Sequence, residues 1–274
     1  MNTPSPSTFD LGELLLLADR ATNLADSFHL LEGADRDVAV GTLTFQVDAA
    51  EQLALGLRQW AGTGSRLRHD HPRVIETADA LRSVAHHARL VGDHLVQALM
   101  AHGRRAEPGS ETPDIRWEAK LYGTAGEQIR AARSLLALIP ATCADAAATF
   151  AATVPYTAPA AGKALAGSRA GSLTDLQGAA LRSAAAGRLE LYAVGPSTYL
   201  SDRGRVRLTR RTVNPLVERG LLRYDDRFAR DNTWRIRLTP PGRAMFLGHL
   251  ARPRSRTAIA LSPPVSLRQR TRRP

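Results

Sequence analysis

The chain has 274 residues, enough for two compact domains, and its low aromatic content of 5% favours closely packed helices over a large sheet sandwich. A single cysteine excludes an intrachain disulfide and a thiolate zinc cluster. The net charge of +11 is uneven: residues 163–274 carry 23 basic and 7 acidic side chains, and such a basic half is typical of proteins that bind a polyanion.

The N-terminal part repeats apolar residues at spacings of three and four, which predicts amphipathic helices. The first helix begins after Asp10, a favourable N-cap residue with Glu13 three positions on. The second helix is predicted to end near residues 62–64, whose sequence is Gly-Thr-Gly. Its opening stretch is rich in β-branched residues and is also compatible with a strand, but the long apolar stripe favours a helix.

Two further helices follow in the same half. One begins at Pro72, a residue favoured in the first turn, and the next continues to an interruption at Pro140. Short connections between helices of this length predict an up-down bundle over residues 8–153, with a long coiled coil as the alternative. This half resembles no family that we recognise, and we expect it to form a homodimer or to receive a signal.

Two segments lack the pattern of a packed core. Residues 154–171 contain prolines and glycines and predict a linker. Residues 251–274 contain seven arginines and no acidic residue, which predicts a disordered basic tail.

Residues 172–250 mix helix and strand signals. A capped helix begins at Thr174 and ends at Gly187, and alternating residues from Leu189 then predict a strand. A second helix over residues 209–220 buries Val213, Leu216 and Val217. Two strands joined by a basic loop follow over residues 222–238, with Arg235 and Arg237 facing away from the apolar side. Residues 195–208 are more typical of a loop or hairpin than of a helix.

Two motifs in this region, TVNPLVERGLL and IRLTPPGRAMF, resemble the recognition helix with its following strand and the end of the wing in winged helix-turn-helix regulators of the MarR-like and PadR-like type. The resemblance covers about residues 172–250. It implies a mainly α protein: an N-terminal helical bundle, a winged helix-turn-helix α+β domain and a basic tail. One departure is that residues 195–208 lack the short second helix that normally precedes the recognition helix.

The resemblance implies that the helix at 209–220 enters the major groove and that the wing at 222–238 meets the DNA backbone. Arginine pairs with guanine and asparagine with adenine, so the expected base contacts are Arg210, Arg211 and Asn214. Each of these arginines could instead be an ordinary solvated surface charge. The expected backbone contacts are Arg205, Arg207, Arg219, Arg223, Arg227, Arg230 and Arg235.

Motifs of catalysis and cofactor binding are not found in the sequence. No two of the histidines from His69 to His102 have the helical spacing of a metal pair, and no phosphate-cradling loop or nucleophile elbow is present. Cys143 lies in an alanine-rich segment and is expected to be packed. We therefore expect no enzymatic activity, no metal and no cofactor, and a cytoplasmic protein that does not enter a membrane.

The sequence thus predicts a DNA-binding transcriptional regulator with double-stranded DNA as its partner. The alternative is a non-enzymatic assembly or scaffold protein that uses the bundle and the winged domain for protein docking. A third hypothesis is a helical sensor with a small-molecule effector, although no polar residues converge in the bundle sequence to define one.

Overall fold

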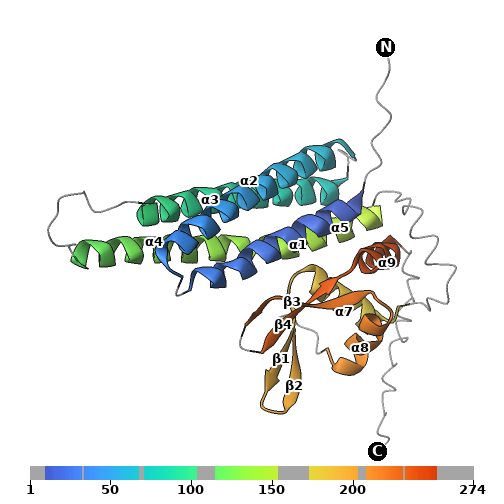
Figure 1. Ribbon diagram of the computed structural model, residues 1–274. Helices are drawn as coiled ribbons and strands as arrows, with labels where there is room; N and C mark the ends of the chain where they lie inside the picture. Colours follow the sequence, from blue (N-terminus) through green and yellow to red (C-terminus); the bar gives the residue numbers. More distant parts are fainter. Residues whose placement is uncertain are drawn as a thin grey trace, which may run out of the picture.

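A computed structural model describes residues 10–32, 34–67, 71–103, 115–153, 173–202, 208–230 and 232–251. The described residues of its N-terminal part, up to residue 153, form helices joined by short connections. Figure 1 shows them lying lengthwise against one another, above the smaller C-terminal part. The helices are α1 (Leu11–Ser27), the 3-10 turn η1 (Phe28–Leu31), α2 (Arg36–Leu67), α3 (Pro72–Gly103), α4 (Ile115–Leu136) and α5 (Ile139–Thr153).

These helices form a bundle, as the apolar spacing predicted. α3 packs against α2, α4 and α5, while α1 packs against α2 and α5. α4 and α5 follow one another along the bundle and are separated by a break at Ala137 and Leu138. Pro140 is the second residue of α5, where its missing N–H is tolerated. Asp10 is the N-cap of α1 and accepts a hydrogen bond from the Gly12 backbone N–H, 2.9 Å long.

The predicted end of the second helix is wrong, because α2 continues through Gly62 and Gly64 to Leu67. Tertiary packing explains why glycine is tolerated there. A Cβ on Gly64 would lie 2.9 Å from Cζ of Phe150, so the glycine lets α2 approach α5 closely. Gly64 therefore marks a contact between two helices and not the end of α2.

The C-terminal part alternates helices with hairpins. Its elements are α7 (Asp175–Ala185), β1 (Leu189–Val194), β2 (Ser197–Asp202), α8 (Arg210–Glu218), β3 (Leu222–Arg230), β4 (Thr233–Leu238) and α9 (Pro240–Ala251). The four strands form one antiparallel sheet in the order β2-β1-β4-β3. The protein is thus mainly helical, with a small sheet in its C-terminal part.

Between α7 and α8 the chain forms a hairpin and not a helix. β1 pairs with β2 from Leu189 opposite Asp202 to Val194 opposite Ser197. The prediction of a loop or hairpin, and not a helix, over residues 195–208 is thus confirmed up to residue 202. Residues 203–207 lie outside the described part. The described residues therefore contain no second helix between α7 and α8.

Local signals at the other boundaries are confirmed. Thr174 and Gln177 form the reciprocal capping box of α7, and Gly187 ends that helix with a φ of +66°. Thr239 begins α9 by accepting a 3.0 Å hydrogen bond from the Gly242 backbone N–H. A Cβ on Gly242 would overlap the carbonyl oxygen of Leu221, which explains the glycine in the Thr-Pro-Pro-Gly sequence.

The sheet has one apolar and one charged face. Leu189, Leu222 and Ile236 are buried, and α7 and α9 contact the sheet. The register pairs Asp225 with Arg235 and Arg223 with Arg237, which places these charged residues on the opposite face. Within that face, Arg235 and Arg237 donate hydrogen bonds to carboxylates of α1 in the bundle. The sheet is therefore covered by helices from both parts of the chain.

One stretch of the described helices, Gly123–Thr153, is long and apolar enough to cross a membrane, and half of its most apolar window is buried in the protein. The predicted linker at 154–171 and the predicted tail beyond residue 251 lie outside the described residues.

Candidate nucleic-acid interface and ionic cluster

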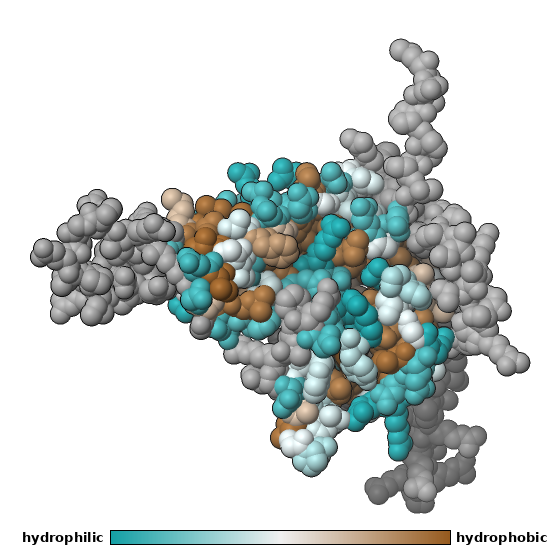
Figure 2. All heavy atoms as spheres, viewed as in Figure 1, coloured by the Kyte–Doolittle hydropathy of each residue, from teal (hydrophilic) through white to brown (hydrophobic). Residues whose placement is uncertain are grey.

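Helix α8 is anchored by one face and exposed on the other. Val213 and Leu216 are buried and Val217 is half-buried, which confirms the predicted apolar face. α8 packs against α7 and β3. Its N-cap, Thr209, has the expected extended backbone but makes no side-chain capping bond. In Figure 2, hydrophilic residues gather at the lower right of the C-terminal part, where Figure 1 places α8.

The three residues expected to contact bases cluster around Asn214 on α8. Arg211 is exposed and Asn214 is half-buried three positions on, so the two share a side of the helix. Arg210, four positions before Asn214, also borders it and donates a hydrogen bond to Thr198 Oγ1 on β2. Glu218 is exposed four positions after Asn214 and adds a carboxylate to the same side.

The residues expected to contact the DNA backbone are dispersed. Arg219 and Arg223 are exposed, at the end of α8 and on β3. Arg227 and Arg230 belong to β3, but their side chains are outside the described part, as are Arg205 and Arg207 altogether. Arg235 differs from all of these.

Arg235 is enclosed by protein groups, and this corrects its expected place on a DNA-facing surface. Its Nη2 lies 2.5 Å from Asp26 Oδ1 and its Nε lies 3.2 Å from Asp26 Oδ2. Its Nη1 donates to Glu190 Oε1 at 2.5 Å and to the Gly187 carbonyl oxygen at 2.7 Å. The side chain is only 18% exposed. Four of its five N–H groups are therefore already engaged.

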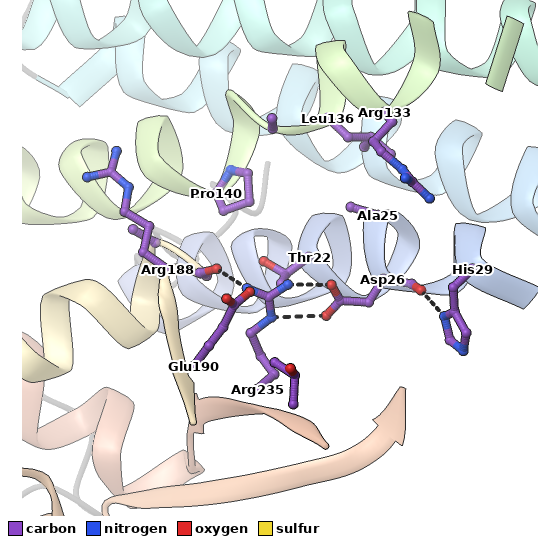
Figure 3. A pocket seen from close by; sticks show the side chains of 14 residues that line it. Thr22, Ala25, Asp26, His29, Arg133, Leu136, Pro140, Arg188, Glu190 and Arg235 are labelled. Carbon is purple, nitrogen blue, oxygen red and sulfur yellow. Dashed lines mark hydrogen bonds and ion pairs between the residues drawn. The ribbon is translucent and has the colours of Figure 1, made fainter. Parts of the chain in front are cut away.

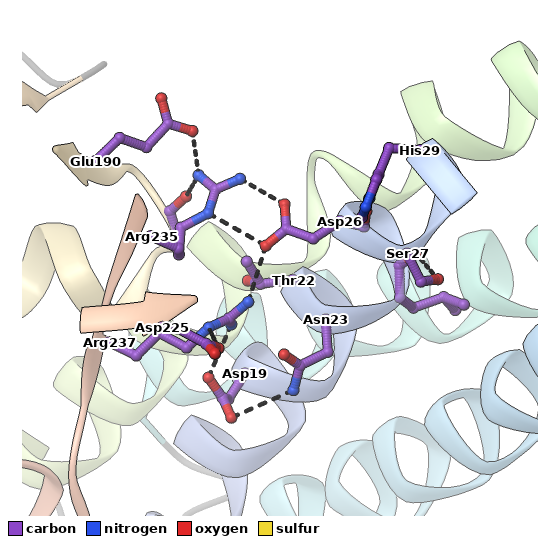
Figure 4. Close-up of polar contacts among 12 residues, drawn as sticks. Asp19, Thr22, Asn23, Asp26, Ser27, His29, Glu190, Asp225, Arg235 and Arg237 are labelled. Atoms are coloured by element: carbon purple, nitrogen blue, oxygen red, sulfur yellow. Dashed lines mark hydrogen bonds and ion pairs between the residues drawn. The ribbon is translucent and has the colours of Figure 1, made fainter. Parts of the chain in front are cut away.

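Arg237 extends this ionic cluster toward the start of α1 (Figure 4). Its Nη1 lies 3.0 Å from Asp19 Oδ1, and its Nη2 lies 2.8 Å from Asp26 Oδ2. Its Nε lies 2.5 Å from Asp225 Oδ2, and both side chains of that pair are 3% exposed. Two arginines of β4 thus bind four carboxylates, two of which come from α1. We call these six residues the ionic cluster: Asp19, Asp26, Glu190, Asp225, Arg235 and Arg237.

Burial and neighbouring charges shift the pKa of Arg235 in opposite directions. Burial alone would lower the pKa of its guanidinium, since it penalises the charged form. The hydrogen bond and the charge of Asp26, with the charges of Glu190 and Asp225, outweigh burial and raise the pKa. Arg235 is therefore charged at neutral pH, and its ion pair with Asp26 joins the sheet to α1 of the bundle.

The sequence carried a weak signal for this cluster. Asp19 and Asp26 are seven positions apart on α1, so they project from the same side of a mostly apolar helix. Residue spacing identified the charged face of β4 but not its partner, because Arg235 and Asp26 are 209 positions apart.

A cavity of about 690 Å³ lies beside the cluster, between the bundle and the sheet (Figure 3). One wall comes from α1 and the junction of α4 with α5, and the other comes from the α7–β1 turn and β4. It is lined by Thr22, Ala25, Asp26, His29, Arg133, Leu136, Ala137, Pro140, Ala186, Gly187, Arg188, Glu190, Thr233 and Arg235.

The only cysteine has no access to solvent. Cys143 is fully buried in α5, and this burial raises the pKa of its thiol to about 12. The thiol is therefore protonated at neutral pH and is not a nucleophile there. Among the described residues, no three histidine, cysteine or acidic side chains gather as metal ligands would.

The chain matches no family model, no curated protein and no solved structure. Its function is therefore inferred from its own residues.

Proposed function

We propose that this protein is a transcriptional regulator that binds double-stranded DNA through the exposed side of α8. The observation that carries the proposal is the placement of Arg211 and Asn214. Both project from a short helix whose opposite side is fixed by Val213 and Leu216. A rigidly held helix with an arginine and an asparagine on its free side suits the edges of guanine and adenine in the major groove.

The backbone contacts of this proposal differ from those expected from the sequence. Arg219 and Arg223 remain candidates, because they are exposed next to α8. Arg235 is removed, because Asp26 and Glu190 already hold its guanidinium. Arg205, Arg207, Arg227 and Arg230 are retained on the strength of the sequence alone.

The β1–β2 hairpin supports α8 in place of a second helix. Arg210 reaches Thr198 on β2, which ties the first turn of α8 to the hairpin. Arg210 therefore serves a positioning role in the free protein and must exchange Thr198 for DNA if it contacts a base. We expect replacement of Arg210 to affect DNA binding less selectively than replacement of Arg211.

The test is a selection of bound DNA from random oligonucleotides, followed by fluorescence anisotropy on the selected and on random duplexes. It requires the full chain, because a fragment without α1 would expose Arg235 and Arg237 and bind DNA through them. Arg211→Ala or Asn214→Ala should weaken binding to the selected site by about 1–3 kcal/mol, and random DNA much less.

Control experiments distinguish sequence-specific binding from binding that depends on charge alone. Arg82→Ala on α3, whose side chain pairs with Asp79, should leave both affinities unchanged. Affinity should fall steeply as salt rises, since counterions are released from the phosphates. Equal losses of affinity for selected and random DNA in the α8 variants would mean that α8 contacts phosphates and does not read bases. No binding at low salt would exclude the DNA-binding function.

The basic tail is proposed to add affinity without specificity. Arginines without a fixed geometry neutralise phosphates but cannot read bases. Deleting residues 251–274 should therefore weaken binding to all duplexes about equally and make the salt dependence shallower. Loss of preference for the selected site would contradict this role.

The alternative, an assembly or scaffold protein, is favoured by exposed apolar side chains on the bundle. Val38 and Phe45 on α2 lie seven positions apart, and Phe45 is 69% exposed. Such a surface suits a second copy of the chain or another protein. A homodimer would also present two copies of α8 to a pseudo-palindromic site, so this observation is compatible with both functions.

A further inference from the structure

The β1–β2 hairpin carries a stacked pair of tyrosines, one of which is exposed. Figure 1 shows this hairpin projecting from the sheet, away from the bundle. Tyr192 on β1 is paired with Tyr199 on β2, and the two rings stack with their centroids 5.5 Å apart and an angle of 24° between their planes. Tyr192 is half-buried, whereas Tyr199 is 48% exposed.

The pair lies on a face of the sheet that is closed at one end and open at the other. Side chains alternate along β1, so Glu190, Tyr192 and Val194 share this face. At Glu190 the face is closed by the ion pair with Arg235, which also binds α1. Toward the hairpin tip it opens, and Val194 is 60% exposed.

The tyrosine stack can be extended in one direction. β2 lies at the edge of the sheet that the described residues form, so Tyr199 is the last ring of its row. One face of its ring lies against Tyr192, and the opposite face points beyond the edge. Ser197 and Ser201 share its side of β2, and these small side chains leave room for a planar group to stack on Tyr199.

The charge around this edge favours an anionic partner. Thr198, the neighbour of Tyr199, accepts a hydrogen bond from Arg210, and Arg211 beside it is exposed. Residues 163–274 carry 23 basic against 7 acidic side chains. This half of the chain therefore repels an arginine-rich peptide and attracts a polyanion. A polyanion that also carries planar groups is a nucleic acid.

The base that stacks on Tyr199 must be unpaired. In a duplex each base lies between its neighbours, and only its edges are accessible in the grooves. The bases of a single strand can instead stack on an aromatic side chain, and this contact tolerates any sequence because every base has a π-face.

We propose that the β1–β2 hairpin binds single-stranded nucleic acid by stacking a base on Tyr199, while the arginines of this half of the chain neutralise the phosphates. The hairpin is thus a binding site of a different kind from α8, for which duplex DNA is proposed. The inference does not rest on duplex binding, and it is tested with single strands alone.

The test is fluorescence anisotropy of the full chain with two labelled strands of about 12 nucleotides, within the usual length of a single-strand site. One is oligothymidylate, and the other is an abasic strand with the same number of phosphates. Because basic side chains attract both strands alike, the ratio of the two affinities measures stacking. We expect oligothymidylate to bind at least about fivefold more tightly, the lower end for one stacked base.

Variants locate the stacking contact. Tyr199→Thr removes the ring but keeps a residue that favours a strand, and it should bring the ratio of affinities to about one. Tyr199→Phe should keep the wild-type ratio, because stacking requires the ring and not the hydroxyl group. Tyr224→Ala on β3 is the matched control and should also keep it, since Tyr224 is 39% exposed but lies on the opposite face of the sheet.

Each outcome decides for or against the proposal. Loss of the preference in Tyr199→Thr alone supports it. A ratio near one in the wild type, an unchanged ratio in Tyr199→Thr, or no binding of either strand at low salt would each overturn it, and the tyrosine pair would then be a surface for another protein. Thermal unfolding of each variant verifies that a changed ratio does not come from a loss of folding.

Discussion

The arginines of α8 and those of β4 look alike in the sequence but occupy opposite environments. Arg210 and Arg211 are exposed, whereas the side chain of Arg237 is 3% exposed and bound by carboxylates from α1 and β3. Both sets contribute to the same basic half of the chain. Net charge therefore overstates the positive surface available to DNA, since carboxylates elsewhere in the chain bind some of the arginines.

The largest expected effect comes from Arg237→Ala. Removing Arg237 takes a buried positive charge away from Asp19, Asp26 and Asp225, of which Asp26 keeps Arg235, and this should lower the free energy of unfolding by about 3–5 kcal/mol. Urea denaturation followed by circular dichroism measures it. Arg223→Ala, at the exposed position opposite on β3, is the control and should cost no more than about 0.5 kcal/mol. Equal losses would mean that the cluster does not stabilise the fold.

On α8 the buried apolar side chain, and not the exposed arginine, is expected to stabilise the fold. Leu216→Ala should lower the free energy of unfolding by about 2–5 kcal/mol, because a fully buried side chain is replaced by a cavity. Arg211→Ala on the exposed side should change it by less than about 0.5 kcal/mol. The same denaturation experiment measures both. A large loss for Arg211→Ala would place that residue in a structural contact and not on a free surface.

A double-mutant cycle on Asp26 and Arg235 sharpens the comparison at the contact between bundle and sheet. The single variants Asp26→Asn and Arg235→Gln and their combination should give a coupling energy of about 1–3 kcal/mol. The cycle is needed because Asp26 also binds Arg237. A coupling energy near zero would show that the Asp26–Arg235 pair does not stabilise the contact between α1 and β4.

The smallest effect concerns the pH dependence at Cys143. Its pKa is raised from 9.0 to about 12 in the folded protein, so the unfolded thiol ionises first as pH rises. Stability should therefore fall through this group above pH 9, by about 1 kcal/mol between pH 8 and 10. Denaturation of the wild type and of Cys143→Ala at these two pH values measures the difference. Parallel pH dependences would contradict the burial of the thiol.

Part of the candidate site could be predicted from the sequence because its signals are local. The apolar positions Val213 and Leu216, with Arg211 and Asn214 opposite, define both sides of α8 within two turns of helix. The carboxylates that occupy Arg235 could not be predicted in this way, since Asp26 meets it only after the chain has folded. The position of Glu218 beside Asn214, four residues on in the same helix, is also a local feature.

The sequence by itself determined the local structure of this protein: the caps at Asp10 and Thr174, the start of α3 at Pro72 and the hairpin at β1–β2. These features depend on neighbours a few positions away. The tertiary structure alone decided that α2 continues past Gly64, that the charged face of β4 is turned to α1, and that a cavity lies between them. Each of these depends on close packing between distant segments, which residue spacing does not encode.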